Sequence, residues 1–453
     1  MSTPPIKQAI IFSLFSCLAL GSVQAQSLRF SGVTYPAITE TPPSSTGLNA
    51  IYVLHDLNGT YGSGVQVTYT ASSASATVTW QRFSALGGGY AEEVTSTRNG
   101  AESTLQRLEG DMGYIVTEDG KSSFFWIVNY ADHEFAIRDL TLSSETDCGT
   151  TWLDVDGNGE RIPYYSITGV PQWLDRDLTL TYTTLTFDDS AQTYRQTEAT
   201  ETIDGFTETI HCTPPLCETD FTLSGDKFKR SWGEETSFTS SIYEPTAVDA
   251  QTWAVQTEHD YYNEVKVDAT LGGSGPVEIH FGAAVTDAAL YHQWEIASDQ
   301  DFNLVSLQYS ELEFDHTFSD QGTTYVRFTA ANAVGECEYQ SDVYQVFIGE
   351  SSLQCPNAFS PGASEGVNDE WKVSYKSITD FECHIFDRHG RQMAHLTHPS
   401  QSWDGKRGGK AVPAGVYFYV IKAVGTDGKK YTLSGDINVV GFSRTATSTT
   451  TTE

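Results

Sequence analysis

Oxygen-bearing side chains recur at alternate positions in one short acidic segment. Asp154, Asp156 and Asn158 are separated by single residues, and Gly159 follows directly. Carboxylate and amide oxygens at this spacing, with a glycine at the turn, are what a calcium-binding loop requires. Such a loop closes with a bidentate glutamate, but Tyr165 stands at that position. We keep two interpretations, an ordinary turn and a weak calcium site, and expect no other cofactor.

Cysteines provide candidate cross-links. The chain has seven of them, and Cys17 lies in an N-terminal apolar run. The others are Cys148, Cys212, Cys217, Cys337, Cys355 and Cys383. An even number in an exported chain predicts disulfides, although the spacing does not select the pairing. A bond from Cys148 to Cys212 or Cys217 would clip one domain, whereas Cys355 and Cys383 lie in segments expected to form neighbouring strands.

Catalytic motifs are missing from the sequence. It contains no HExxH, G-x-S-x-G, phosphate-binding or CxxC motif, and Asp132-His133-Glu134 suits a turn between strands. Histidines are dense near the C-terminus, at spacings that fit no single metal-binding face, so we expect surface or turn positions for His384, His389, His395 and His398. We therefore expect a protein that is not an enzyme.

The N-terminus has the features of an export signal. Lys7 precedes an apolar run from 9 to 20, and Val23-Gln24-Ala25 is a small-residue cleavage site, so residues 1–25 form the predicted signal peptide. Lipidation at Cys17 is the alternative. No later apolar run is long enough to span a bilayer, so we expect no transmembrane segment after signal removal.

Charge is distributed unevenly along the chain. The formal net charge is −33, yet acidic and basic residues nearly balance from Cys355 onward. The acidic part disfavours nucleic acid and anionic membranes as partners, and it keeps an exported chain soluble. Divalent cations that screen this surface are a second interpretation. The near-neutral end fits a segment that docks on a receptor of its own.

Alternating and apolar runs separated by turn residues predict β-structure upstream of that end. We expect an immunoglobulin-like sandwich over 27–146, with Trp80 and Trp126 in its core, and a second one over 147–262. A platform for sugar stacking is an alternative role for a group of aromatic residues, namely Trp152, Tyr164, Tyr165 and Trp173. Core packing or turn support is the role that we favour for them.

Residues 263–350 resemble a PKD domain. The pieces that carry the resemblance are Gly272 to Pro276, Tyr291 to Trp294, His316-Thr317-Phe318 and Gly322 to Val326. Such domains are spacers or adhesive modules, and the resemblance implies that Trp294 anchors the core. The Gly-Asp turn that usually follows this tryptophan is absent.

The strongest strand signal lies near the C-terminus. Gly415 to Ile421 reads GVYFYVI, and successive residues of a strand point to opposite faces. Because both faces are apolar, we expect a central strand that is covered on both sides, with Phe418 buried. Asp404-Gly405 and Asp427-Gly428 suit tight hairpins around it.

Residues 355–443 resemble the type B sorting domain of type IX secretion, the gliding-motility-associated C-terminal domain. The resemblance is carried in order by PNAFSP, GVND, IFDRHG, WDG and PAGVY. The residues that match its motif are Pro356, Asn357, Phe359, Pro361, Asn368, Asp369, Phe386, Gly390, Trp403, Asp404, Gly405, Gly415, Val416 and Tyr417. His389 replaces the usual tryptophan. The resemblance implies outer-membrane type IX secretion components as partners, and residues 444–453 are expected to be a disordered tail.

These observations predict an all-β chain of tandem immunoglobulin-like sandwiches that ends in a small antiparallel sorting sandwich. We expect it outside the cell or on its surface, reached through the periplasm of a Gram-negative bacterium. Adhesion or binding of an unknown extracellular ligand is the expected role. The alternatives are an accessory component of the secretion machinery and a secreted glycan-binding or hydrolytic protein.

Overall fold

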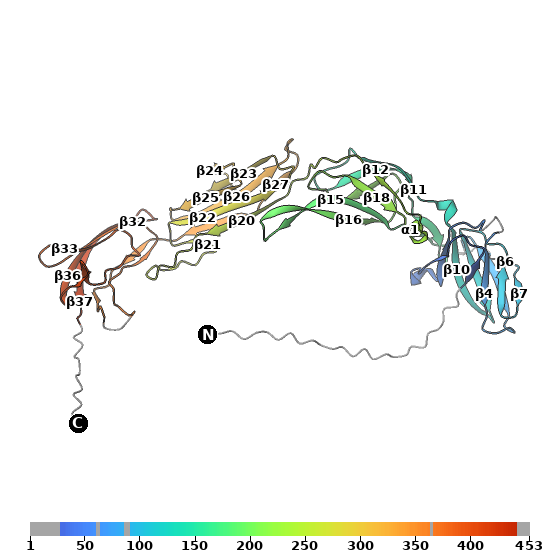
Figure 1. Ribbon diagram of the computed structural model, residues 1–453, viewed down its shortest axis with the longest axis horizontal. Coiled ribbons are helices and arrows are strands. Elements are labelled where there is room, and N and C mark those ends of the chain that lie inside the picture. The colour runs from blue at the N-terminus through green and yellow to red at the C-terminus, as the bar shows by residue number, and fades with distance from the viewer. Residues whose placement is uncertain (1–27, 60–63, 86–90, 363–365, 442–453) are drawn as a thin grey trace, which may run out of the picture.

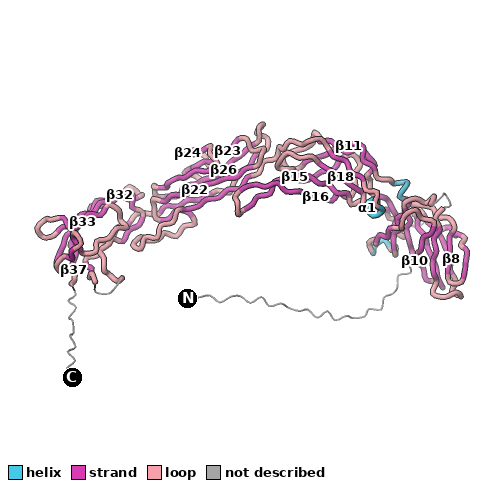
Figure 2. The backbone as a smooth tube through the Cα atoms, viewed as in Figure 1, coloured by secondary structure: helices cyan, strands magenta, loops and turns pink. Residues whose placement is uncertain are grey.

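Strands make up nearly all of the regular structure, as the alternating sequence predicts. The computed structural model describes residues 28–59, 64–85, 91–362 and 366–441. Figure 1 shows sheet-built units in a curved row, with β4 near one end and β37 near the other. Figure 2 shows that the helical turns gather where the first unit meets the second. We call the units the first module (28–135), the second module (136–249), the third module (250–349) and the C-terminal domain (352–441).

The first module consists of two facing sheets. The four-stranded sheet has the order β1-β4-β8-β7, with bounds Arg29–Ser31, Gln66–Thr70, Glu102–Leu105 and Thr97–Asn99. The six-stranded sheet has the order β2-β3-β10-β9-β5-β6, with bounds Ile38–Glu40, Ala50–Leu54, Lys121–Asn129, Met112–Glu118, Val78–Phe83 and Glu92–Val94. Trp80 is buried between the sheets beside Tyr69, as the sequence predicts.

The six-stranded sheet is buried on both faces. Along β10, Phe125 and Ile127 face the core of the first module, whereas Trp126 and Val128 face outward into a cluster that also contains Leu153 of the second module. This double burial explains the unbroken apolar runs AIYVL and FFWIV, because a strand covered on both faces needs no polar alternation. The first two modules therefore share one hydrophobic core.

The second module begins earlier than the sequence predicts. Strand β11 (Ala136–Leu142) pairs with β12 (Thr151–Asn158), so it leaves the predicted 27–146 sandwich and joins the next sheet. The remaining strands are β13 (Ile162–Tyr165), β14 (Pro171–Leu174), β15 (Leu178–Asp188), β16 (Thr193–Ile203), β17 (Thr209–Cys212), β18 (Phe221–Gly225) and β19 (Thr236–Thr239). The helix α1 (Lys227–Trp232) follows β18, and its N-terminal turn is capped by Asp226.

The third module also begins earlier than predicted. Strand β20 (Ala250–Gln256) pairs with β22, although it lies inside the predicted second sandwich, 147–262. The other strands are β21 (Leu271–Gly273), β22 (Val277–Val285), β23 (Tyr291–Ala297), β24 (Val305–Tyr309), β25 (Glu313–Phe318), β26 (Gly322–Ala331), β27 (Glu338–Gln340) and β28 (Tyr344–Ile348). Trp294 is fully buried among Phe281 and Phe328, as the PKD resemblance implies.

The C-terminal domain is built on a five-stranded sheet of order β30-β37-β36-β32-β33. Their bounds are Ala358–Phe359, Lys430–Val439, Gly415–Gly425, Ile378–Phe386 and Gln392–Leu396. Two short pairs, β29 (Ser352–Gln354) with β31 (Ser374–Lys376) and β34 (Lys406–Arg407) with β35 (Lys410–Ala411), complete it. The predicted strand is central in this sheet, since β36 pairs with both β32 and β37.

Two predicted segments lie wholly outside the described residues. The signal peptide, 1–25, and the tail, 444–453, both belong to the terminal stretches that the structure leaves undescribed. Among the described residues, none of the helices has the length and apolar character needed to cross a membrane.

The shared core predicts how the N-terminal half unfolds. Replacing Trp126, which is 1% exposed and packs against Tyr165 of the second module, by alanine should cost about 3–5 kcal/mol. Trp173, which is 51% exposed, is the matched control, and its replacement should cost within about 0.5 kcal/mol. Calorimetry of the full chain should show the first two modules unfolding together and shifting together in the Trp126→Ala variant. Separate transitions for the two modules would contradict a shared core.

Candidate functional site

Motif residues of the C-terminal domain meet in an aromatic cluster. Phe359, Trp403 and Tyr417 come from three separate motif pieces, and their rings lie 5.4 and 5.3 Å apart in that order. All three side chains are buried. A Cβ at Gly405 would lie 3.2 Å from the Phe359 ring and from Pro361, so the glycine allows the turn to close over the cluster. These residues hold the domain together.

Backbone contacts join the other motif pieces to this cluster. The indole of Trp371 donates to the carbonyl of Pro356 at 2.8 Å, and the carbonyl of Asn357 accepts from the Asn438 amide at 2.9 Å. Asn368 adopts a left-handed φ of 52°, and its carbonyl accepts from the Ser360 amide at 2.8 Å. Strand β30 is thereby fixed along the edge of β37.

Three aspartates fix the turns of the same domain. Asp369 accepts the amides of Gly362 and Gly366 at 2.9 and 2.7 Å. Asp404 accepts the amide of Lys406 at 3.0 Å and pairs with its ammonium group at 2.8 Å. Asp387 closes the turn that contains Gly390, whose φ is 79°. Each carboxylate accepts hydrogen bonds from backbone amides of its own turn, which explains why an acidic residue suits each of these three positions.

The outer face of the sheet contradicts one sequence prediction. The inward residues of β36 are Tyr417, Tyr419 and Ile421, whereas Val416, Phe418 and Val420 are 47%, 44% and 39% exposed. The expectation that both faces are covered, and that Phe418 is buried, was therefore wrong. Apolar residues on both faces predict burial only when a second layer exists, and no described segment packs over this face. We call Val416, Phe418 and Val420 the outer strip; it starts just after Gly415, whose φ is 152°.

Phe386 extends the outer strip sideways. It is the cross-strand neighbour of Phe418, and its side chain is only partly buried. Exposed apolar side chains that lie next to one another in this way mark surfaces for binding other proteins. The motif thus has two parts, an inner set that forms the core and an outer set, Val416 and Phe386, that faces solvent.

The same outer face brings two histidines together, which corrects a further prediction. His384 of β32 lies directly opposite His395 of β33, with the rings parallel and 4.3 Å apart. Their spacing along the chain hides this proximity, because the hairpin register that includes a bulge after Ile385 decides which residues face each other. His389 lies in the turn between these strands, away from the pair.

The predicted turn or calcium loop is a strand instead. Asp154, Asp156 and Asn158 lie on β12, a strand paired on both sides, where alternate residues stand about 6.7 Å apart in a line. A line of this kind cannot wrap around a cation. Asp156 pairs with Arg138 at 2.8 Å, and the pKa of its carboxyl is lowered by that hydrogen bond. Gly159 is required because the Phe206 ring packs where a Cβ would stand.

The disulfide joins two modules rather than clipping one. Cys148, in the turn between β11 and β12, is bonded to Cys337 of the third module, with the Cα atoms 5.4 Å apart. The predicted bonds of Cys148 to Cys212 or Cys217 are therefore wrong, as is a bond between Cys355 and Cys383. Those four thiols are free, and burial raises the pKa of Cys383 to about 12, which makes it unreactive. The sequence left the pairing open, and nothing in the cysteine spacing reveals a contact between modules.

Two of the aromatic residues proposed as a sugar platform, Tyr164 and Trp173, lie on opposite faces of their hairpin. Tyr164 is buried, whereas Trp173 is 51% exposed. They belong to neighbouring strands whose register puts Tyr164 opposite Gln172, so the two rings point to opposite sides. The alternative of core packing holds for Tyr164, and Trp173 lies at the surface beside Arg161.

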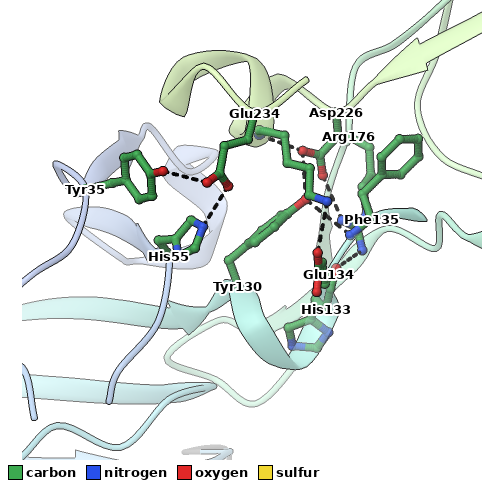
Figure 3. Close-up of polar contacts among 10 residues, drawn as sticks. Tyr35, His55, Tyr130, His133, Glu134, Phe135, Arg176, Asp226 and Glu234 are labelled. Atoms are coloured by element: carbon green, nitrogen blue, oxygen red, sulfur yellow. Dashed lines mark hydrogen bonds and ion pairs between the residues drawn. The ribbon is translucent and has the colours of Figure 1, made fainter. Parts of the chain in front are cut away.

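Ionisable groups also converge where the first module meets the second (Figure 3). Arg176 and Asp226 form an ion pair at 2.7 Å with side chains 3% and 0% exposed. The Tyr130 hydroxyl donates to Asp226 at 3.0 Å, and the Arg176 guanidinium donates to the carbonyl of His133 at 2.7 Å. Since Tyr130 and His133 belong to the first module, the pair ties the two modules together. No sequence signal marks it.

A second set of contacts surrounds this pair. Glu234 accepts hydrogen bonds from Tyr35 at 2.5 Å and from His55 at 2.9 Å (Figure 3). Lys229 pairs with Glu134 at 3.0 Å. The Tyr35 hydrogen bond is the main cause that lowers the pKa of Glu234, and the same bond raises the pKa of Tyr35. Both groups titrate away from neutrality, so they suit a polar junction better than proton transfer near pH 7.

Two family models match parts of the chain. Residues 353–439 match the CHU_C type IX secretion signal domain, and residues 141–240 match a fibronectin type III domain. The C-terminal segment is therefore a type IX secretion signal domain, which implies export by the type IX route. The fibronectin match agrees with tandem immunoglobulin-like sandwiches. No curated protein matches the chain.

Several solved structures align with parts of the chain. A tetra-tandem repeat from the extending region of a large adhesion protein is 14% identical, covers 83% of this chain and 95% of its own, and has a TM-score of 0.19. Dimeric latent PorU from Porphyromonas gingivalis is 12% identical, covers 72% of this chain and 36% of its own, and has a TM-score of 0.16. The fibronectin(III)-like modules of Clostridium thermocellum CbhA are 12% identical, with 39% and 93% covered and a TM-score of 0.17. At TM-scores this low, none of them bears on function.

The turn at Asp387 predicts that the stability of the C-terminal domain falls in acid. Burial acts to raise its pKa, but hydrogen bonds from Arg391 and His389 outweigh burial and lower the pKa to about 2. A lowered pKa stabilises the folded state above the unfolded value of about 3.9, and this stabilisation is lost as the pH falls toward 2. Asp387→Asn should flatten the dependence of unfolding on pH between about 4 and 2. Asp380→Asn, an exposed position of the same hairpin, is the control, and parallel curves for Asp387→Asn and the unaltered chain would contradict the prediction.

Proposed function

We propose that this protein is exported to the cell surface or beyond, where its modules form a stiff stalk for adhesion or partner binding without enzyme activity. The observation that carries the proposal is the arrangement in Figure 1, in which the secretion signal domain lies at one end of the row and the first module at the other. A chain held by its C-terminal domain would present the first module farthest from the cell.

Bonded junctions between the modules support a stiff stalk. The first two modules share a core and the Arg176–Asp226 pair, and the second is joined to the third by the disulfide. At the last junction, Asn263 donates to carbonyls of Val373 and Pro399 at 2.7 and 2.8 Å, although it comes from the third module. Such contacts restrict hinge motion, which is otherwise the default between domains.

The outer strip is the surface that we propose for docking on outer-membrane type IX secretion components. It is apolar and exposed on a near-neutral domain, whereas the rest of the chain is strongly acidic. Low charge removes the long-range repulsion that the modules would meet at an acidic partner, and apolar side chains supply the area that binding buries. The core residues of the motif would act indirectly, because they hold the strip in place.

One prediction of the proposed function concerns export. Deleting residues 353–453 should leave the protein in the periplasm of a host that has the type IX machinery, measured by surface labelling and fractionation. Fusing 353–453 to an inert periplasmic reporter should move the reporter to the surface. A truncated chain that still reaches the surface would overturn the assignment of the signal.

The second prediction concerns the outer strip. Phe418→Ser should lower surface display severalfold while leaving the unfolding midpoint of the C-terminal domain nearly unchanged, since the ring is 44% exposed. Lys422→Ser, farther along the same strand on the same face, is the matched control and should be displayed normally. Normal display of Phe418→Ser would remove the strip as the docking surface and leave the export signal itself intact.

The third prediction separates the candidate roles. Cells that display the chain should attach to surfaces or partner cells, and removing the first and second modules as one unit, because they share a core, should reduce attachment while display is kept. Co-purification with outer-membrane secretion components after export is complete would instead favour the accessory role. Turnover of a polysaccharide or peptide library by the full chain would overturn the proposal of a protein that is not an enzyme.

A further inference from the structure

One carboxylate and two imidazoles form a compact group on the β32–β33 hairpin. The Nε2 atoms of His384 and His395 lie 3.0 and 3.3 Å from the same oxygen, Oε1 of Glu382. Glu382 and His384 are alternate residues of β32 and share its outer face, and His395 lies opposite His384 on β33. All three potential ligand atoms are within 4.8 Å of one another.

We propose that Glu382, His384 and His395 bind a transition-metal cation of the Zn²⁺ class. Two imidazole nitrogens and one carboxylate oxygen are the ligand set that such cations prefer, and they disfavour Ca²⁺ and Mg²⁺, which take oxygen ligands. Ligands at about 2.0–2.1 Å from a tetrahedral ion stand roughly 3.3 Å from each other. The two oxygen–nitrogen separations already match that edge. The two imidazole rings lie parallel, so they must tilt toward each other until the ion lies in the plane of both rings.

The group is also free of competing cations. Among the described residues, Glu382 forms ion pairs only with the two histidines. Lys422 lies opposite Glu382 on β36 but makes no ion pair with it within the described part of the chain. Replacement of the two hydrogen bonds by metal bonds therefore displaces no lysine or arginine. Three ligands leave at least one coordination position open to solvent, on the same face as the outer strip.

The surroundings of His384 set the expected strength of binding. Its Nδ1 atom is buried and has no hydrogen-bond partner among the residues that the structure describes. Ligating histidines usually donate this second nitrogen to a carbonyl or carboxylate, and loss of that bond weakens metal affinity by about 10–100-fold. We expect a labile site that fills from the medium once the domain is outside the cell. The ion would fasten the edge strand β33 to β32.

The test uses the full chain, purified and treated with chelator. Zn²⁺ binding is followed by calorimetry, and Co²⁺ is used as a spectroscopic probe of nitrogen ligands. The unaltered chain should bind Zn²⁺ at one site that a large excess of Ca²⁺ does not displace. His395→Gln and Glu382→Gln should each weaken this binding by at least about tenfold. The visible Co²⁺ bands should weaken in the same variants.

His389→Gln is the matched control, because this histidine lies in the same hairpin outside the group. It should bind Zn²⁺ as the unaltered chain does. Unfolding curves without metal show whether each variant folds, and added Zn²⁺ should raise the unfolding midpoint of the C-terminal domain only where the three ligands are present. Equal Zn²⁺ affinity in the His395→Gln variant and the unaltered chain would overturn the site and would assign the binding to the acidic surface.

Discussion

The buried ion pair between Arg176 and Asp226 is the constraint on which the N-terminal half of the molecule depends. Both charges are removed from water, which is tolerable only because each finds several partners at once. Asp226 also accepts the amide of Lys229 at 2.9 Å and so caps α1, while Arg176 reaches carbonyls in both modules. Losing either partner would leave an uncompensated buried charge, at a cost of about 3–5 kcal/mol. The position of the first module against the second therefore depends on these polar contacts together with the shared core.

The C-terminal domain divides its motif between two tasks. Phe359, Trp403 and Tyr417 hold the sheet together from inside, and the aspartates hold its turns. Residues on the other face, Phe418 among them, contribute little to packing. The inner residues fix the frame of the domain, and the outer residues stay exposed to solvent. That division explains why the core residues could be predicted from the sequence and the exposure of the outer strip could not.

Strand positions and several core residues could be predicted from the sequence. Trp80, Trp126 and Trp294 are buried as expected, because a large aromatic side chain in a strand gains much stability from burying its apolar area. Phe418 was misjudged, because alternation reports how apolar a face is and not whether a second layer covers it. Strands β11 and β20 were assigned to the wrong neighbours, since local pattern carries no information about pairing partners.

The candidate sites were harder to predict than the fold. The pairing of His384 with His395 depends on a bulge, and the bond from Cys148 to Cys337 depends on how two modules stack. Both are long-range consequences of packing. Asp154 and its neighbours have the composition of a loop. They nevertheless form a strand, because β12 pairs with β11 and the Phe206 ring packs against Gly159 at its end. Composition alone gave the wrong local geometry there.

The bond between Cys148 and Cys337 closes a ring of chain that contains most of the second and third modules, with a sequence separation of 189. An exported protein meets proteases, and an exposed loop is where they cut. Any single cut inside this ring leaves both fragments covalently attached, so a nicked molecule keeps its distal end. After a cut inside the ring, the bond must also be reduced before the first module is shed.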